Sequence, residues 1–339
     1  MEALVSGMNG TIRKVSVTGP IGKTVVCEYG VIENTDGKTG EKTEEKTAVI
    51  EIAKAAGLTL LSEEERNPLY TTTYGVGEVI KDAVRNGCRK FIVGIGGSAT
   101  NDGGAGMLQA LGFGLLKENG EQIPIGARGL EELAEITDDN VIPELAECKF
   151  KIACDVTNVL CGETGASAVY GPQKGADEEM TERLDRLLFS YASLVKKKIP
   201  KADSMYPGTG AAGGLGFAFL TFMDAQLESG IQIVIKETGL EQEIAKADLV
   251  ITGEGRMDGQ TAMGKAPIGI AKIAKKYGKP VIAFAGAAAR DAGACNEQGI
   301  DAFFPILREA VSLEAAMKRE NAEANMEAAV EQAYRLWRL

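Results

Sequence analysis

Residues 94–104, GIGGSATNDGG, decide the fold because they join two predicted elements of different kinds. They follow the apolar run KFIVGIG (residues 90–96), which is typical of a buried strand, and precede AGMLQALGFGLL (residues 105–116), which has a helical pattern. Open α/β sheets bind anions and nucleotides where a strand is followed by a helix. The stretch therefore predicts an α/β fold with a phosphate or nucleotide turn. The alternative is tight packing of the strand against the helix.

Regular patterns on either side of this turn predict further elements. Strands are expected at 11–19, 23–32, 47–53 and 149–156, and helices at 71–87, 102–120 and 177–198. The charged connector 33–46 is expected to be a solvated hairpin loop.

Farther along the chain, Thr238 and Glu241 match a capping box that would start a short helix. Residues 248–286 read as a strand, a helix and a second strand, which form a βαβ unit. A helical tail over 312–339 is expected to pack through four apolar side chains: Met317, Val330, Leu336 and Trp337.

The alternating α/β elements occur in two blocks, with β-rich material before and between them. We therefore expect two α/β domains with a ligand cleft between them. One is an open parallel sheet built from 62–145 plus 240–339, with helix 1–10, and the other is a mixed α/β domain built from 11–61 plus 146–239.

Composition excludes several classes of protein. The formal net charge of −11 argues against a nucleic-acid partner, and the longest apolar run, at 215–223, is too short to cross a membrane. The N-terminus has no basic segment of a secretory signal, and six irregularly spaced cysteines indicate reduced thiols in the cytoplasm. Because the chain has no histidine, catalysis must use carboxylates, Lys, Arg, backbone amides or a hard cation.

Three groups of residues could carry chemistry. The turn offers the backbone N–H groups of Gly96, Gly97 and Ser98 beside a helix N-terminus, which favours an anion. Asp155 lies at the end of a predicted strand, where a carboxylate holds Mg²⁺ or takes a proton, or else caps a helix. The third group mixes acids and bases among glycines, as a Mg²⁺–phosphate site requires: Glu254, Arg256, Asp258 and Lys265.

Two more glycine-rich segments stand out, at 170–176 and 208–217, with Lys174 and Thr209 as their polar members. The first would grip an acid substrate or a phosphate, and the second reads as a loop that opens a helix. For the first segment a simple turn, and for the second a tight helix crossing, is about as good an interpretation as the functional one.

Five motifs in order, GIGGSATNDGG, CDVTN, VYGPQKGA, GAAGGLG and GEGRMDGQTAMGKAP, resemble the bacterial type I glycerate kinase family. ERNPLYTTTYGVGE, before the first motif, is similar to the same family. The resemblance runs along nearly the whole chain. It implies an ATP-dependent kinase that phosphorylates D-glycerate with Mg²⁺, with 2-phosphoglycerate as the favoured product, on two α/β domains of which the parallel one is flavodoxin-like.

The resemblance also implies roles for individual residues. Nucleotide or substrate binding falls to Gly96, Gly97, Ser98, Asn101, Asp102, Lys174, Gly213, Gly214 and Glu254. Catalysis falls to Asp155, Asp258, Arg256 and Lys265, and metal binding to Asp102, Asp155 and Asp258. The protein is possible as a homodimer. The sequence does not decide which Asp is the catalytic base and which binds the metal.

One departure from the family pattern concerns the start of the chain. Family members begin with a strand that ends in Asp-Ser-Phe-Lys-Gly and continue to a DGGEGT turn, whereas this sequence begins at the next helix, MEALVSGMNG. We expect a missing strand–helix–strand unit of about 30–40 residues, owing to a start-site error or a truncated gene product. Two alternative functions remain: an impaired remnant of such a kinase, and a dinucleotide-binding oxidoreductase.

Overall fold

A computed structural model describes residues 2–35 and 42–338. By its internal contacts the chain divides into two compact units, Met1–Gly230 and Ile231–Leu339. Each unit has α/β architecture, as the sequence predicts, and each is described by itself.

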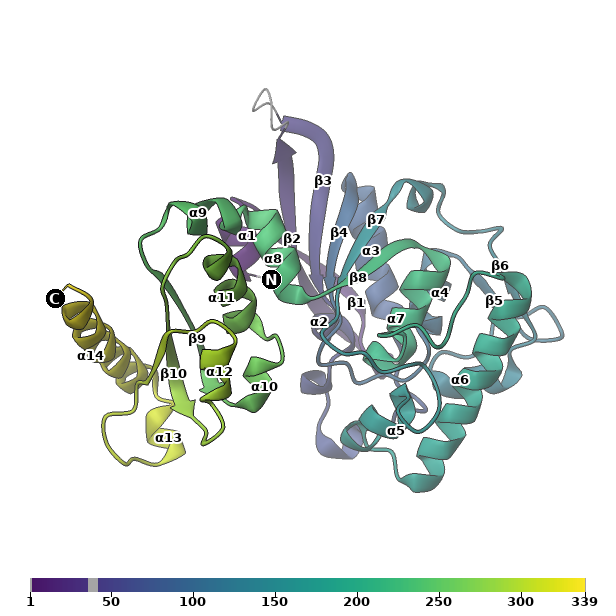
Figure 1. Cartoon of the computed structure of the whole chain (residues 1–339). Helices are drawn as coiled ribbons and strands as arrows, with labels where there is room; N and C mark the ends of the chain where they lie inside the picture. The colour runs from purple at the N-terminus through teal and green to yellow at the C-terminus, as the bar shows by residue number, and fades with distance from the viewer. Residues whose placement is uncertain (1, 36–41, 339) are drawn as a thin grey trace. The chain divides into compact units, whose positions relative to one another are not determined.

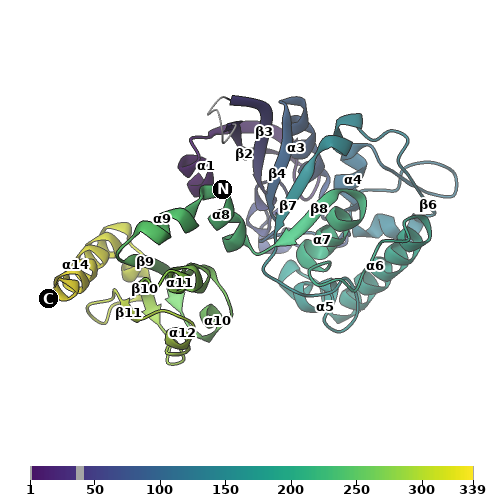
Figure 2. The same ribbon diagram turned by 45° about the horizontal axis from the view of Figure 1, so that its top comes forward.

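Unit 1 is built on a six-stranded mixed sheet (Figures 1 and 2). Its strands are β1 (Thr11–Thr18), β2 (Thr24–Thr35), β3 (Lys42–Glu51), β4 (Cys88–Gly94), β7 (Lys149–Ala153) and β8 (Asp224–Glu228), in the order β1-β2-β3-β4-β7-β8. The first three are antiparallel, while β4, β7 and β8 run parallel to β3. The tight turn between β1 and β2 permits only antiparallel pairing, whereas a helical crossover precedes β4.

Helices and short elements surround this sheet. They are α1 (Glu2–Gly7), α2 (Ala53–Ala56), α3 (Tyr74–Arg85), α4 (Ala105–Leu111), α5 (Ala166–Tyr170), α6 (Glu178–Lys198) and α7 (Ala211–Phe222). Five 3₁₀ turns lie at Leu58–Leu60, Glu63–Glu65, Ala127–Glu132, Pro143–Glu147 and Pro172–Lys174, and a small second sheet pairs β5 (Gly114–Leu116) with β6 (Glu135–Thr137). In the core, the rings of Phe91 on β4 and Phe150 on β7 stack with centroids 4.6 Å apart.

Most of the elements predicted for unit 1 are confirmed, with one clear correction. The helix expected to run to Gly120 ends at Gly112, and β5 follows at once. Gly112 has a φ of 102°, and a Cβ there would lie 2.0 Å from the backbone oxygen of Asn140. A left-handed glycine in contact with another segment ends the helix. The predicted loop 33–46 is shortened by β2 and β3, and its centre, 36–41, lies outside the described residues.

Unit 2 contains a three-stranded parallel sheet in the order β11-β10-β9. Along the chain its elements are α8 (Gly230–Thr238), α9 (Leu240–Lys246), β9 (Val250–Met257), α10 (Gly259–Ala262), α11 (Ala266–Lys276), β10 (Val281–Ala288), α12 (Ala294–Glu297), β11 (Ala302–Pro305), α13 (Leu313–Ala316) and α14 (Arg319–Trp337). The predicted βαβ unit is confirmed as β9, α11 and β10.

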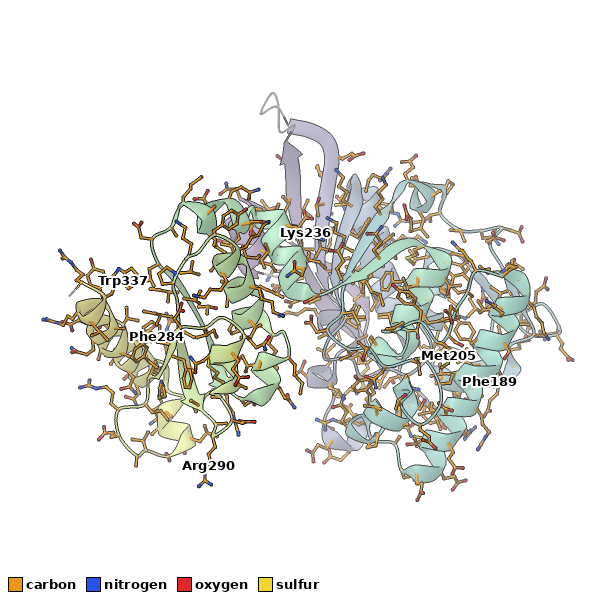
Figure 3. The ribbon with its side chains drawn as sticks, viewed as in Figure 1. Phe189, Met205, Lys236, Phe284, Arg290 and Trp337 are labelled. Carbon is orange, nitrogen blue, oxygen red and sulfur yellow. The ribbon has the colours of Figure 1, made fainter. Side chains whose placement is uncertain are left out.

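Two details of unit 2 differ from the sequence prediction. The Thr238 hydroxyl donates to the Val234 backbone oxygen at 2.7 Å, and α9 begins after Gly239 without a side-chain cap, so the predicted capping box is wrong. In the helical tail, Val330 packs beside Phe284, but the side chain of Trp337 is 43% exposed (Figure 3). Met317 and Leu336 are more exposed still.

The units group the chain differently from the predicted domains. Strand β4, which we expected to share a domain with 240–339, lies between β3 and β7 in the sheet of unit 1. Its backbone pairs with both neighbours, and this hydrogen bonding keeps 62–145 with the segments before and after it. All six cysteines are free thiols, as predicted. Within residues 2–35 and 42–338, every helix is too short or too polar to cross a membrane.

Candidate active site

The glycine-rich turn begins where β4 and β7 end side by side. Gly94, the last residue of β4, is paired with Ala153, the last residue of β7. The segments that leave these two strands therefore start from neighbouring points on one sheet edge. The turn is also tied to α2: the Ala99 N–H donates to the Ala56 oxygen at 2.8 Å. This is the edge at which open α/β sheets bind ligands.

A cavity of about 220 Å³ opens at this edge of unit 1. It is lined by the turn, by segments that follow β7 and α5, and by the start of α7: Ile95, Gly96, Gly97, Ser98, Ala153, Cys154, Asp155, Val156, Tyr170, Gln173, Lys174, Ala211 and Ala212. Five residues predicted from the sequence thus share one cavity: Gly96, Gly97, Ser98, Asp155 and Lys174.

Asp155 is an exposed carboxylate in the cavity wall. Its Oδ1 accepts hydrogen bonds from the Ser229 hydroxyl at 2.8 Å and from the Gly230 N–H at 3.1 Å. Both donors follow β8, the strand beside β7. They hold one carboxylate oxygen and so orient the group. A carboxylate in such a position is suited to accept a proton from a substrate hydroxyl.

Lys174 is a cation at the inner side of the cavity, with 1% of its surface exposed. Its Nζ donates to the Thr100 backbone oxygen at 2.7 Å. Burial lowers the pKa of Lys174 to about 7, although the nearby Asp102 carboxylate acts in the opposite direction. The Lys174 side chain therefore links the segment after α5 to the glycine-rich turn, and in its protonated form it supplies positive charge next to the cavity.

Asp102 lies behind the cavity and is fully buried. Its Oδ2 accepts from the N–H and the hydroxyl of Thr73, at 2.8 and 2.9 Å, and from the Gly106 N–H at 3.3 Å; its Oδ1 accepts from the Gly104 N–H at 3.1 Å. Burial raises the pKa of Asp102, and these bonds oppose that rise. The carboxylate joins the beginnings of α3 and α4, and it does not line the cavity.

Asn101 is also fully buried beside this site. Its Nδ2 donates to the Ser167 hydroxyl at 2.9 Å, while its Oδ1 has no hydrogen-bond partner among the described residues. Thr100 Oγ1 is unpartnered in the same sense. Unpaired polar atoms are rare in protein interiors and ask for an explanation. Here they lie next to the backbone that Lys174 binds.

Gly213 and Gly214 hold the start of α7 against the glycine-rich turn. They follow Ala212 in three successive left-handed conformations, with φ values of 52°, 69° and 92° along the chain. The Gly213 oxygen accepts from the Gly103 N–H at 2.9 Å, and a Cβ on Gly213 would lie 2.0 Å from the Thr100 oxygen. In this structure both glycines allow close backbone packing, while Ala212 lines the cavity.

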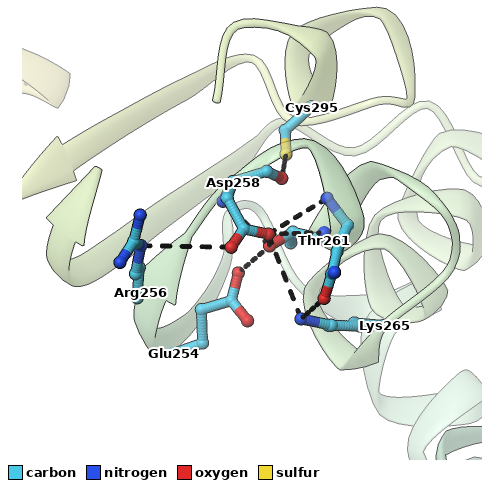
Figure 4. A network of polar contacts seen from close by, with 7 residues as sticks. Glu254, Arg256, Asp258, Thr261, Lys265 and Cys295 are labelled. Atoms are coloured by element: carbon cyan, nitrogen blue, oxygen red, sulfur yellow. Dashed lines mark hydrogen bonds and ion pairs between the residues drawn. The ribbon is translucent and has the colours of Figure 1, made fainter. Parts of the chain in front are cut away.

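The remaining predicted residues gather at the carboxyl end of β9 in unit 2 (Figure 4). Asp258 caps α10, and its Oδ1 accepts from the backbone N–H groups of Gln260 and Thr261 at 3.0 and 3.2 Å. Arg256 Nε lies 4.0 Å from Asp258 Oδ2, and Lys265 Nζ lies 4.0 Å from Oδ1. The two cations thus flank one carboxylate, at the distance limit of an ion pair.

Glu254 joins this cluster through Thr261, whose hydroxyl donates to Glu254 Oε1 at 2.5 Å. Glu254 and Asp258 provide hard oxygen ligands, which is the chemistry that Mg²⁺ prefers, and Mg²⁺ commonly uses one or two carboxylates together with substrate phosphates. The donor set at β9 fits that requirement. Among the described residues, no cluster brings together three or more His, Cys, Asp or Glu side chains as a ready-made metal site.

Sequence reasoning missed several residues that position the predicted ones. Thr73 binds Asp102, and Ser167 binds Asn101. Ser229 binds Asp155, and Thr261 binds both Glu254 and Asp258. Only Thr261 carried a readable signal, because Asp258 followed three residues later by Thr resembles an N-terminal capping pattern. The other partners come from distant parts of the chain.

Comparisons with known proteins all indicate one family. Residues 1–338 match the model of the glycerate kinase family. The glycerate kinase of Halalkalibacterium halodurans is 47% identical over 319 residues, which cover 94% of this chain and 81% of that protein. The glycerate 2-kinase of Escherichia coli K12 is 46% identical, with the same coverage. A solved structure from Salmonella typhimurium LT2, described as a glycerate kinase 2, aligns with a TM-score of 0.83 at 46% identity and covers 98% of this chain and 84% of its own.

Proposed function

Because the chain belongs to the glycerate kinase family and is therefore a kinase, we propose that it phosphorylates D-glycerate with ATP and Mg²⁺. Membership of this family favours phosphoryl transfer over the oxidoreductase alternative. Phosphoryl transfer depends on positioning and charge stabilisation and has no need of histidine, which this chain lacks.

The unit 1 cavity is the observation that carries the choice of a small acid. At about 220 Å³ it is smaller than the roughly 300–1,000 Å³ of pockets for drug-sized ligands. Its wall holds the Ser98 hydroxyl, the Asp155 carboxylate and the Lys174 ammonium. A three-carbon hydroxy acid matches this size and this mixture of a cation, an acceptor and hydroxyl groups.

We assign roles within that cavity from the geometry. Lys174 provides attraction for the glycerate carboxylate, and Ser98 with the glycine backbone provides donors. Asp155, oriented by Ser229, accepts the proton of the attacking hydroxyl. Asp102, which we first expected to bind ligand or metal, instead positions the turn through its four internal hydrogen bonds.

The β9 cluster is assigned to the phosphate groups of the nucleotide. Arg256 and Lys265 face developing negative charge, and Glu254 and Asp258 would hold Mg²⁺. When bound, the ion neutralises phosphate charge. The residues of the chain itself orient the two carboxylates and supply the cations around them.

A coupled assay for ADP formation tests the proposal. The protein should turn over ATP with D-glycerate and Mg²⁺, and Asp155→Asn should lose at least about 100-fold in kcat. Phosphorus NMR of the product should show 2-phosphoglycerate, the product we favour and the position that the name of the Escherichia coli relative indicates. Absence of ADP formation with glycerate would overturn the substrate assignment and favour the impaired-kinase alternative if ATP still binds.

A further inference from the structure

Thr261 occupies a central position in the β9 cluster and has no role in the assignments above. It is the third residue of the short helix α10, and none of its surface is exposed. Its hydroxyl donates to Glu254 Oε1 at 2.5 Å and accepts from the Asp258 backbone N–H at 3.1 Å. One side chain therefore contacts both acidic residues of the cluster (Figure 4).

The direction of these bonds follows from the chemistry of a hydroxyl, which has a single hydrogen to donate. Glu254 Oε1 is 2.5 Å from the hydroxyl oxygen and Asp258 Oδ1 is 3.5 Å away, so the hydrogen goes to Glu254. Asp258 is held separately, because its Oδ1 accepts from the N–H of the same threonine. Each carboxylate is fixed by a different group of Thr261.

Without this residue the arrangement has a clear weakness. Glu254 and Asp258 carry like charges on the same short stretch of chain, and like charges repel. Glu254 is only partly buried and has a flexible side chain, so it would turn towards water. The Thr261 hydroxyl gives it one preferred orientation beside Asp258.

We propose that Thr261 is a positioning residue, which holds Glu254 and Asp258 as a pair for the Mg²⁺-bound phosphates of the nucleotide. This inference rests on the proposed function. Groups that orient metal-binding side chains typically contribute about 10- to 100-fold to metal affinity or activity. Thr261 acts through the two carboxylates and does not itself contact substrate.

The test compares Thr261→Val, which removes the hydroxyl, with Thr261→Ser, which keeps it. Calorimetric titration with ATP in the presence of Mg²⁺ should show about 10- to 100-fold weaker binding for Thr261→Val, with Thr261→Ser within about threefold of wild type. The KM for glycerate should change by less than about threefold in both. Thr238→Val is the matched control, since it removes a hydroxyl that binds only a backbone oxygen in α8.

A double-mutant cycle separates positioning from a general structural defect. If Thr261 acts through Glu254, Glu254→Gln with Thr261→Val should bind ATP no more weakly than Glu254→Gln alone. Multiplied losses, an unchanged Thr261→Val, or a Thr261→Ser as weak as Thr261→Val would each overturn the inference. Should Thr261→Val not fold, Thr261→Ala takes its place in the cycle. Wild-type turnover of glycerate, measured in parallel, tests the proposed function independently.

Discussion

The Lys174 ammonium donates a 2.7 Å hydrogen bond to the backbone oxygen of Thr100, in the glycine-rich turn beside the cavity. Burial lowers the pKa of this ammonium to about 7. In an unfolded chain the pKa is about 10.4, so between these values the unfolded state binds more protons and the free energy of unfolding rises with pH. Below pH 7 both states are charged and the cost of burying the charge is fully present.

Lys174→Met should remove this pH dependence. From about pH 7 to about pH 8.5, the wild-type free energy of unfolding should rise relative to that of the variant, with a slope of up to about 1.4 kcal/mol per pH unit. Urea unfolding at several pH values measures the difference, in which the contributions of the buried cysteines cancel. Parallel curves for the two proteins would show that Lys174 stays charged in the folded state.

Gly213→Ala should destabilise unit 1. A Cβ at this position would lie 2.0 Å from the Thr100 oxygen, on a residue with a φ of 69°. We expect the free energy of unfolding to fall by at least about 2 kcal/mol, with loss of glycerate turnover. Gly293→Ala is the control, because a Cβ at that residue would point into open space and its φ is −55°. That variant should stay within about 0.5 kcal/mol of wild type.

Asp102→Asn should reduce stability. The amide of Asn cannot accept all of the bonds that Thr73, Gly104 and Gly106 donate to the buried carboxylate. A loss of about 2–4 kcal/mol in urea unfolding is expected. Wild-type stability with a selective loss of ATP binding would instead return Asp102 to the metal or nucleotide role first predicted for it.

Asp155→Asn, in contrast to Asp102→Asn, should reduce activity and leave stability nearly unchanged. This carboxylate is exposed, and Asn keeps an oxygen that accepts from Ser229, so the melting temperature should stay within about 2 °C of wild type. The kcat should fall by at least about 100-fold, while the KM for ATP changes little. An active Asp155→Asn enzyme would exclude Asp155 as the base.

Lys265→Met should weaken nucleotide binding through the loss of a cation beside Asp258. We expect the KM for ATP to rise about tenfold or more, with the melting temperature unchanged. Lys272→Met, on the exposed surface of α11, the helix that Lys265 precedes, provides the matched control and should leave the KM within about twofold. Equal effects of the two variants would indicate a general influence of net charge.

The sequence predicted those elements whose pattern is strong and local. The helical periodicity of α3 is an example, and one face of that helix is buried. The alternating run at β1 also forms the predicted strand, although Val17 is the one residue of it that is buried. The predicted helix end at Gly120 was wrong because the helix already ends at Gly112. The predicted cap at Thr238 was wrong because the Thr238 hydroxyl binds the backbone oxygen of Val234. Pattern alone could not tell Gly112 from Gly120 as the end of the helix.

At the site, five residues predicted from the sequence line one cavity. The sequence could not distinguish buried residues that position the site from exposed residues that can meet a ligand. Asp102 and Asp155 both follow glycine-rich or strand-end segments, yet one is fully buried and the other is open. The difference depends on Thr73, which lies far from Asp102 in the sequence and reaches it through the packing of α3 against α4. Such long-range partners leave no local signal.

All of the residues that line the unit 1 cavity belong to the continuous segment Met1–Gly230, and the Gly103–Gly213 hydrogen bond joins the glycine-rich turn to the start of α7. During synthesis from the N-terminus, the glycine-rich turn therefore cannot form this hydrogen bond until Gly213 has left the ribosome. Domains generally fold as units as they are made. Unit 1, which carries the cavity, can thus be assembled before β9 has left the ribosome, so the order of translation places the small-molecule cavity first and the β9 cluster second.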